Sequence, residues 1–580
     1  MADLSNTAIA DAFDELADLY ELDGAVVHRV LAYRTAAKNV RSATVSVAQL
    51  TREGRVTSLP GIGRTLEEKI LAMIETGTIP ALTKLRDRIP PGLAAMTRLP
   101  GVGPKRVRAL YDQLGIDSLE TLRAAAESGR LSGAKGFGEK FSESVLAALD
   151  AGVAERPAPR TVLDTAMEIG ERVVAALRDH PAAVHVEIAG SARRLADSVK
   201  DLDIVAAATE PAALAGALAG IDVLETAGSA GENAARGRAH TGLGIDLRVV
   251  EPDQFGNLLQ HFTGSAAHNV ALREAAVRRG LHVSEYGILD DATGETTRCA
   301  TEEEVYERLG LAWIEPELRE DRGELAPGFV PPRLVTVEDL RGDLHCHTTL
   351  SDGRSTLEDM ARGAQERGYE YLAITDHSAT HGFGDHVTPD ELRRQIERVR
   401  ELDAQLDGIT LLAGTETNIL PDGRPDYDDE LLAELDWVVA SVHTSFAMSE
   451  RDMTARMVAA IEHPWIDAIG HPTGRKISKR DAYKVDVDAL IEAAARTGTM
   501  LEINGAPDRR DLNDVHARAA AEAGVMVLVD SDAHDAERLK HVRWGVATAR
   551  RAWLGPDQIA NTRPWAEFAG LRKRVKAAAA

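Results

Sequence analysis

The chain has 580 residues, 44% of them hydrophobic and 27% charged, so it is a globular protein too long for a single core. Its formal net charge of −25 argues against tight nonspecific binding to DNA, but not against DNA as a substrate. With two cysteines, no basic segment before an apolar run at its start and no apolar stretch of membrane-spanning length, we expect a cytoplasmic protein without structural disulfides or a membrane partner.

Residues 1–150 are predicted to be helical, because apolar residues recur at helical spacing between glycine-rich turns. Two segments, SLPGIGRTLEEKI at 58–70 and RLPGVGPKRVRAL at 98–110, repeat L-P-G-x-G before a helix. Glycines permit a tight turn, and the helix start offers N–H groups to a phosphate. The repeat therefore favours helix–hairpin–helix contacts with a DNA backbone over plain turns. The DNA-binding candidates are Gly61, Gly63, Gly101, Gly103 and Lys105.

Lys69 follows the second glycine of the first hairpin by six residues. A lysine near DNA can attack an aldehyde sugar and form a Schiff base if its pKa is lowered. Spacing alone favours a solvated helix lysine.

The middle of the chain carries paired carboxylates. Asp201 and Asp203 are two apart on a predicted strand, so both face one side, and Asp246 lies on another predicted strand, GIDLRVV. Three converging carboxylates can hold two divalent cations, which activate a hydroxyl and stabilise a leaving phosphate.

Phosphate donors precede these acids in VHVEIAGSARRLADSVKDLD. Gly190 and Ser191 end a strand, where backbone and hydroxyl donors can hold phosphate, and Arg193 and Arg194 can offset triphosphate charge. A D-x-D pair alone is a weak signal, but its combination with GS-x-RR and a later strand acid is far more specific.

On these motifs, residues 1–322 resemble a family-X DNA polymerase of the DNA polymerase beta type. The resemblance implies a lyase-like helical domain at 1–80, a fingers-like domain at 81–150, a nucleotidyltransferase palm at 151–255, a thumb at 256–322 and a linker at 323–340. It makes the three aspartates palm ligands of Mg or Mn, and Lys69 the lyase lysine. It also implies nucleotide contacts by Gly190, Ser191, Arg194, Phe262, Gly264 and Asn269, and a DNA contact by Arg273.

Three residues depart from the family pattern. Lys200 stands where glycine usually precedes D-x-D, His261 where tyrosine is usual, and Leu195 where a glycine follows the arginine pair. None removes a metal ligand, so we expect an active, if inefficient, polymerase. The alternative is a DNA-binding module that only delivers a nuclease or phosphatase to gaps.

From 341 to about 575, strand-like and helix-like segments alternate, which predicts an α/β domain, plausibly a barrel with its site at the strand carboxyl ends. Histidines and acids follow its short apolar runs. Their nitrogen and oxygen donors suit Mn, Zn or Fe, whereas Cys346 is expected to be packed. The metal-ligand candidates are His345, His347, Asp352, His377, Glu416, His443, His471, Asp532 and His534.

This segment resembles the polymerase and histidinol phosphatase (PHP) family in its H-x-H, TDH, GHP and terminal D-x-H motifs. The resemblance implies a distorted (β/α)7 barrel in which these nine side chains hold up to three Mn, Zn or Fe ions. Asp376 is interpreted as an orienting neighbour of His377 rather than a ligand. Arg475 and Lys476 follow His471 and could grip phosphate, although a solvated loop is the favoured interpretation.

A polymerase core before a PHP domain resembles bacterial family-X polymerases along nearly the whole chain, which makes it a multidomain α+β and α/β protein. The implied function is filling of short gaps from deoxynucleoside triphosphates in base-excision repair, on gapped or nicked DNA. The PHP domain would add a 3′–5′ exonuclease or 3′-end phosphodiesterase, in a monomer that associates with the nucleoid during repair. Abasic-site endonuclease and 5′-deoxyribose-phosphate lyase activities are left open. A phosphatase for small phosphate monoesters is the other alternative, and the helical hairpins argue against it.

Overall fold

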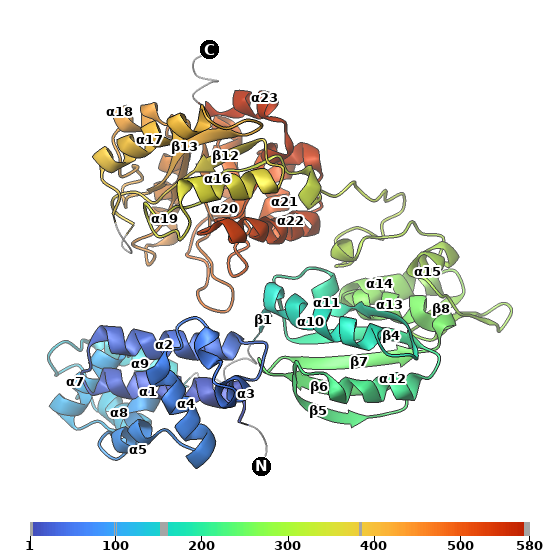
Figure 1. The fold of residues 1–580 in the computed structure, drawn as a ribbon, viewed down its shortest axis with the longest axis horizontal. Coiled ribbons are helices and arrows are strands. Elements are labelled where there is room, and N and C mark those ends of the chain that lie inside the picture. Colours follow the sequence, from blue (N-terminus) through green and yellow to red (C-terminus); the bar gives the residue numbers. More distant parts are fainter. Residues whose placement is uncertain (1–3, 98, 100, 151–159, 382–385, 574–580) are drawn as a thin grey trace. The chain divides into compact units, whose positions relative to one another are not determined.

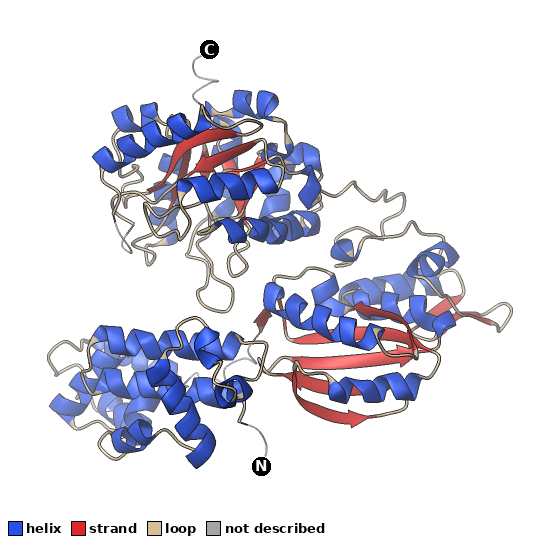
Figure 2. Ribbon diagram, viewed as in Figure 1, coloured by secondary structure: helices blue, strands red, loops and turns tan. Residues whose placement is uncertain are grey.

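The computed structural model describes residues 4–97, 99, 101–150, 160–381 and 386–573 (Figures 1 and 2). Within these, no helix combines the length and apolar character needed to cross a bilayer. The chain forms two compact units. The first comprises Met1–Arg160, Glu168–Glu187 and Lys200–Glu251, and the second Thr161–Met167, Ile188–Val199 and Pro252–Ala580.

The front of the first unit is helical, as predicted (Figure 2). Ile9, Phe13 and Leu16 lie on one face of the first helix at helical spacing, and all are fully buried. Asn6 ties this helix to the loop before α3, because its side chain donates to Val45 O (2.8 Å) and accepts from Val47 N (2.8 Å). The helices are α1 (Asn6–Leu22), α2 (Val27–Ser42), α3 (Val47–Arg52), α4 (Arg64–Thr76), α5 (Pro80–Arg86), α6 (Pro91–Met96), α7 (Pro104–Leu114), α8 (Leu119–Glu127) and α9 (Glu139–Asp150).

A five-stranded sheet of order β2-β4-β7-β6-β5 follows. β4 and β7 pair in parallel, whereas β6 is antiparallel to both β7 and β5. The apolar run of β4 is buried, which places this strand in the core. The strands of this sheet and the helices beside them in the chain are α10 (Leu163–Arg178), β2 (Ala183–Ile188), β4 (Asp201–Ala208), α12 (Pro211–Ala217), β5 (Leu224–Ala230), β6 (Ala234–Ala239) and β7 (Gly244–Val250).

The second unit begins with short elements and a small antiparallel sheet of order β10-β9-β8. Leu272, Ile288 and Tyr306 form part of a core between this sheet and its helices. The elements are β1 (Thr161–Val162), α11 (Gly190–Arg193), β3 (Ser198–Val199), α13 (Phe255–Thr263), α14 (Ala266–Val277), β8 (Leu281–Ser284), β9 (Gly287–Asp290), β10 (Thr296–Thr297) and α15 (Glu302–Arg308).

The C-terminal part is a nearly closed barrel of parallel strands in sequential order. A parallel bridge between Cys346 and Ala533 joins the segments that follow its first and last strands. Cys346 is fully buried in the core, as expected of a packed side chain. The strands are β11 (Gly342–Asp343), β12 (Tyr371–Ile374), β13 (Thr410–Asn418), β14 (Trp437–Ser441), β15 (Ala468–Ile469), β16 (Met500–Asn504) and β17 (Val527–Asp530).

Helices surround this barrel (Figure 2). Several begin at a side chain that accepts a backbone N–H of the first turn, such as Thr356, Thr388 and Ser449. The predicted fold class is confirmed: a helical front, a mixed middle and a (β/α)7 barrel. The helices are α16 (Leu357–Glu366), α17 (Pro389–Asp403), α18 (Asp429–Glu434), α19 (Glu450–Glu462), α20 (Val487–Thr497), α21 (Asp514–Glu522), α22 (Val542–Arg551) and α23 (Trp565–Phe568).

Candidate functional site

The metal-ligand candidates gather at one end of the barrel. In a parallel barrel all strand carboxyl ends open on the same side, so residues far apart in sequence meet there. The candidates are His345 and His347 after β11, Asp352 in the loop beyond, His377 after β12, Glu416 in β13, His443 after β14, His471 after β15, and Asp532 and His534 after β17.

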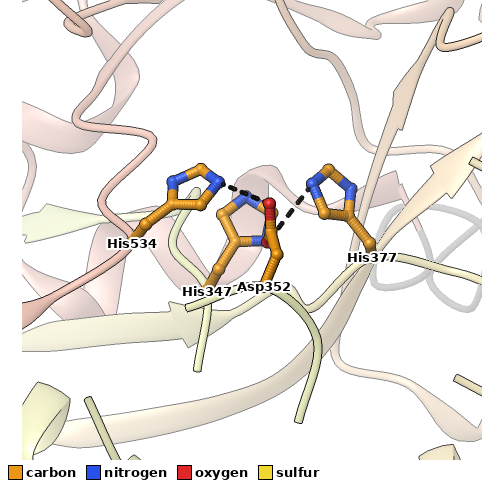
Figure 3. A group of neighbouring side chains, drawn as sticks. All are labelled: His347, Asp352, His377 and His534. Carbon is orange, nitrogen blue, oxygen red and sulfur yellow. Dashed lines mark ion pairs between the residues drawn. The ribbon is translucent and has the colours of Figure 1, made fainter. Parts of the chain in front are cut away.

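One group of four is drawn in Figure 3: His347, Asp352, His377 and His534. The carboxylate of Asp352 lies between two histidines, with its Oδ2 3.2 Å from His534 Nε2 and its Oδ1 3.6 Å from His377 Nε2. The donor atoms of the group lie within 4.8 Å of one another, a spacing at which they can share one ion.

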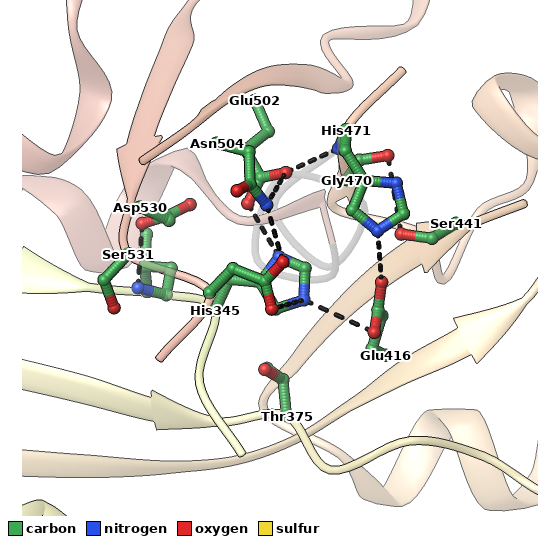
Figure 4. Close-up of polar contacts among 12 residues, drawn as sticks. His345, Thr375, Glu416, Ser441, Gly470, His471, Glu502, Asn504, Asp530 and Ser531 are labelled. Atoms are coloured by element: carbon green, nitrogen blue, oxygen red, sulfur yellow. Dashed lines mark hydrogen bonds and ion pairs between the residues drawn. The ribbon is translucent and has the colours of Figure 1, made fainter. Parts of the chain in front are cut away.

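Glu416 contacts four histidines of the cluster. Its carboxylate lies 2.8 Å from His377 Nδ1, 3.2 Å from His443 Nε2 and 3.1 Å from His471 Nε2. Figure 4 shows it reaching His345 as well, at 3.4 Å. Glu416, His377 and His443 form a second group able to hold an ion.

The third group comprises His345, His347 and Asp532. Asp532 Oδ1 lies 3.2 Å from His347 Nε2. All nine predicted side chains therefore lie in one cluster. Among the described residues, eight belong to the three groups, and His471 contacts Glu416 beside them.

The electrostatics of two histidines and of Glu416 in the cluster fit metal binding. Burial, reinforced by neighbouring histidines for His347 and by Arg509 for His471, lowers the pKa of each of these two histidines to about 3, so both are neutral and able to ligate at neutral pH. Burial raises the pKa of Glu416, but the surrounding histidines lower it well below its ordinary value. Within the part of the chain that the structure describes, neither carboxylate oxygen of the buried Glu416 accepts a well-directed hydrogen bond, which is the state expected of a metal ligand.

Sequence reasoning missed the residues behind the ligands. Glu502 Oε1 lies 2.6 Å from His345 Nδ1, and Asn504 Nδ2 donates to Asp532 Oδ2 at 3.0 Å (Figure 4 shows the Glu502 contact). Glu502 thereby leaves Nε2 of His345 facing Glu416 and Asp532. Their signal was available: in MLEIN the two side chains alternate with apolar residues and face one side of β16.

Arg509 is a further missed residue. Its Nε lies 3.3 Å from Asp532 Oδ2, and its buried Nη1 has no hydrogen-bond partner among the described residues. Lys476 lies in the same electrostatic neighbourhood: burial lowers its pKa, as does Arg509, whereas Asp508 and Asp532 raise it. Arg509 therefore places a positive charge beside Asp532, a ligand candidate that lies 23 residues further along the chain.

One interpretation is corrected. The Arg475 side chain is not solvated, because 18% of it is exposed and its Nη1 lies 2.9 Å from Asp197 Oδ2. Asp376, interpreted as an orienting neighbour of His377, contacts the turn after H-x-H. Its carboxylate accepts from Thr348 N (2.7 Å), Thr348 Oγ1 (2.7 Å) and Ser351 Oγ (2.6 Å).

The three palm candidates lie on neighbouring strands of the first unit. Asp201 and Asp203 are on β4, and Asp203 stands opposite Asp246 of β7. Arg236 of β6 is also opposite Asp246, with Nε and Oδ1 3.0 Å apart. These acids are partly or fully exposed, in contrast to the buried barrel cluster.

The nucleotide candidates lie in the second unit. Gly190 opens α11 with a φ of +62°, a conformation that favours glycine. Arg194 donates through Nε to Glu320 (2.9 Å) and through Nη1 to Thr263 O (2.9 Å). Ser191 lies on α11, Phe262 on α13, Gly264 in the turn after α13 and Asn269 on α14, which also carries the DNA candidate Arg273.

Gly264 and Asn269 are joined in this turn. Asn269 Nδ2 donates to Gly264 O (3.2 Å) and to His261 O (2.7 Å), and Arg273 Nε donates to Asn269 O (3.0 Å). A Cβ on Gly264 would come within 2.5 Å of the Asn269 side chain, so the close approach requires glycine.

The two glycine hairpins share one conformation. Gly61 and Gly101 have φ values of +74° and +75°, and Gly63 and Gly103 are the N-caps of α4 and α7, neither helix having a side-chain cap. No side chain therefore caps the N–H groups in the first turn of either helix, which leaves these groups available to an anion. Lys69 is half-buried on α4, and Lys105 is exposed on α7.

Comparison with known families agrees with this arrangement. Family models match a helix-hairpin-helix domain at residues 5–79, a SAM-like helix-hairpin-helix tandem at 93–151, a DNA polymerase beta thumb at 258–320 and a PHP domain at 343–506.

Similar proteins fall into two kinds. The chain is 35% identical over 563 residues to the DNA polymerase/3'-5' exonuclease PolX of Bacillus subtilis (strain 168), across 97% of this chain and 98% of the relative. It is 33% identical over 203 residues to a "Probable phosphatase" of Caldanaerobacter subterraneus, across 33% of this chain and 75% of the relative. A "Probable phosphatase" of Shewanella sediminis is 31% identical over 242 residues, which is 40% of this chain and 94% of the relative.

Proposed function

Because this chain belongs to the family-X DNA polymerases that carry a PHP domain, we propose that it fills short DNA gaps and trims DNA 3′ ends with its barrel. The observation that carries the proposal is the complete set of nine donors, most of them buried, in a chain that matches a polymerase/exonuclease along 97% of its length. The substrates are gapped or nicked DNA with free 3′ ends and deoxynucleoside triphosphates.

The barrel is the proposed nuclease site. Up to three Mn, Zn or Fe ions, when bound, would polarise the scissile phosphodiester and activate water. Glu416 and Asp532 would hold neighbouring ions, and Glu502 and Asn504 would fix the ligands in their orientation. Arg509 would bind a nonbridging phosphate oxygen, because its buried Nη1 needs an acceptor.

The palm is the proposed polymerase site. Asp201, Asp203 and Asp246 would hold Mg or Mn together with the triphosphate, which fits their exposure and their position on adjoining strands. Around the nucleotide we assign Gly190, Ser191, Arg194, Phe262, Gly264 and Asn269 as contacts.

The two glycine hairpins are the proposed binding site for the DNA backbone. Gly61, Gly63, Gly101 and Gly103 present helix N–H groups, and Lys105 adds charge. We assign Arg273 as a further DNA contact.

Several assignments stay predictions. They are the role of Lys69 as a lyase nucleophile, abasic-site cleavage, the monomeric state, association with the nucleoid in the cytoplasm, and the domain limits.

A phosphatase for small monoesters is less well supported. Its named relatives match 33% to 40% of this chain, whereas the polymerase/exonuclease matches 97%. Hairpins that fit a DNA backbone have no part in hydrolysis of a small ester.

The test is a primer assay on a one-nucleotide gap and on a single-stranded 3′ end, with wild type, Asp203→Asn and Asp532→Asn. We expect Asp203→Asn to lose incorporation and keep trimming, and Asp532→Asn to do the reverse. A wild-type enzyme that never extends the primer would contradict the polymerase function. Trimming that survives Asp532→Asn would contradict the nuclease site.

A further inference from the structure

The segment Arg194–Asp197, which connects α11 to β3, is held by an arginine from the loop after β16. Arg510 is 1% exposed, and it donates through Nη1 to Ala196 O (3.0 Å) and through Nη2 to Leu195 O (2.9 Å). A buried guanidinium must have its hydrogen bonds made, and Arg510 makes two of them to this one segment.

Two more arginines of the barrel reach the same segment. Arg475 Nη1 lies 2.9 Å from Asp197 Oδ2, and Arg551 Nη1 donates to Arg194 O at 2.8 Å. Arg475 and Arg510 are also joined, because Arg475 Nη2 donates to Arg510 O. The three side chains come from two different loops and one helix of the barrel, so the contact does not depend on the conformation of a single loop.

The held segment is conformationally demanding. Leu195 has a φ of +56°, a left-handed conformation that a residue with a Cβ disfavours. On the inner side, Leu195 N donates to Ala192 O (2.9 Å) and Ala196 N to Ser191 O (3.0 Å). The carbonyls of Leu195 and Ala196 are then bound from the outside by Arg510, which fixes the turn on both sides.

The contact also reaches the side chain of Arg194. Glu320 Oε1 accepts from Arg194 Nε (2.9 Å) and from Arg551 Nη1 (2.8 Å), and both arginines are nearly buried. One carboxylate therefore links the barrel to the guanidinium that we assign to the incoming triphosphate.

We propose that Arg475, Arg510 and Arg551 are positioning residues for nucleotide incorporation: they hold the segment Arg194–Asp197, and through it Arg194 and the end of α11, in the triphosphate-binding form. This inference rests on the proposed role of Arg194 as a nucleotide contact. It makes the PHP barrel part of the polymerase through residues other than the metal ligands. Loss of such a contact displaces a binding group, so it raises the KM for nucleotide more than it lowers kcat.

The experiment uses the full chain and measures KM and kcat for the templating nucleotide on a one-nucleotide gap, with trimming of a single-stranded 3′ end as a second readout. We expect Arg510→Met to raise KM about 10-fold with kcat changed less than about 3-fold. Asp197→Asn and Arg475→Met, which remove the two sides of one ion pair, should raise KM by similar, smaller factors, and their double variant should be no worse than the worse single one.

The matched control is Arg480→Met. Arg480 lies on the same loop as Arg475 but donates to Gly474 O inside that loop, so its loss should leave KM unchanged. A KM within about 2-fold of wild type in folded Arg510→Met would overturn the proposal. If Arg510→Met does not fold, additive effects of Asp197→Asn and Arg475→Met, or none, overturn it instead. Absence of primer extension by the wild-type chain would contradict the polymerase function itself, a separate result.

Discussion

The three palm candidates and the barrel cluster are both sets of side chains suited to divalent ions, yet they are built in opposite ways. Asp201 is exposed and Asp246 is 28% exposed beside an arginine, with no histidine in the set. The barrel offers nine donors, most of them buried, with further residues orienting them from behind. A few exposed carboxylates suit ions that arrive with a nucleotide's phosphates, whereas a buried nitrogen-rich set suits ions that stay with the protein.

Glu416→Gln tests this difference with the largest expected effect. Glu416 contacts His377, His443 and His471, so the substitution should release bound metal. We expect 3′-end trimming to fall by more than about 100-fold, which is more than the loss typical of residues that only orient a ligand. Metal content after dialysis and single-turnover trimming measure it. Primer extension with added Mg should stay at the wild-type rate. A parallel loss of extension would mean that the two centres are not independent.

Arg509→Met is expected to have an intermediate effect. If Arg509 binds a phosphate oxygen, trimming should fall about 10- to 100-fold, while metal content stays at the wild-type level, because the residue touches a ligand without being one. Arg538→Met is the control, since Arg538 pairs with Asp535 at 3.2 Å, in the segment that follows the ligands Asp532 and His534. Loss of metal together with activity would make Arg509 a support of Asp532 instead.

The ligand set was predictable from the sequence, whereas the pairing of each supporting residue with its ligand was not, for a physical reason. The ligand candidates directly follow apolar runs, so a local pattern in the sequence is enough to identify residues such as His345 and Asp532. Glu502 acts on His345 from 157 residues away, and Arg509 acts on Asp532 from another strand's loop. Such pairs depend on which strands are neighbours, and only the fold supplies that. Arg475 is the sharpest case, because its partner Asp197 is 278 residues away.

The hairpins extend the comparison to a third region, where the expected effect is smallest. Gly101 has a φ of +75°, and a Cβ there would meet open space apart from Arg106 Nη1 at 3.8 Å. Gly101→Ala should therefore cost about 1 kcal/mol of backbone strain and shift the N–H groups at the start of α7. We expect DNA affinity on a gapped duplex to fall about 5-fold, with metal content unchanged.

Gly77→Ala is the matched control for this prediction. Gly77 has nearly the same φ, +77°, with nothing within 4 Å of an added Cβ, but it ends α4 instead of opening a hairpin helix. Both variants should lose similar stability on thermal unfolding, since the strain is the same. Only Gly101→Ala should lose DNA affinity, measured by fluorescence anisotropy at fixed salt. Equal losses in the two would show that the effect is one of stability, and that the hairpin glycines are turns without a part in DNA binding.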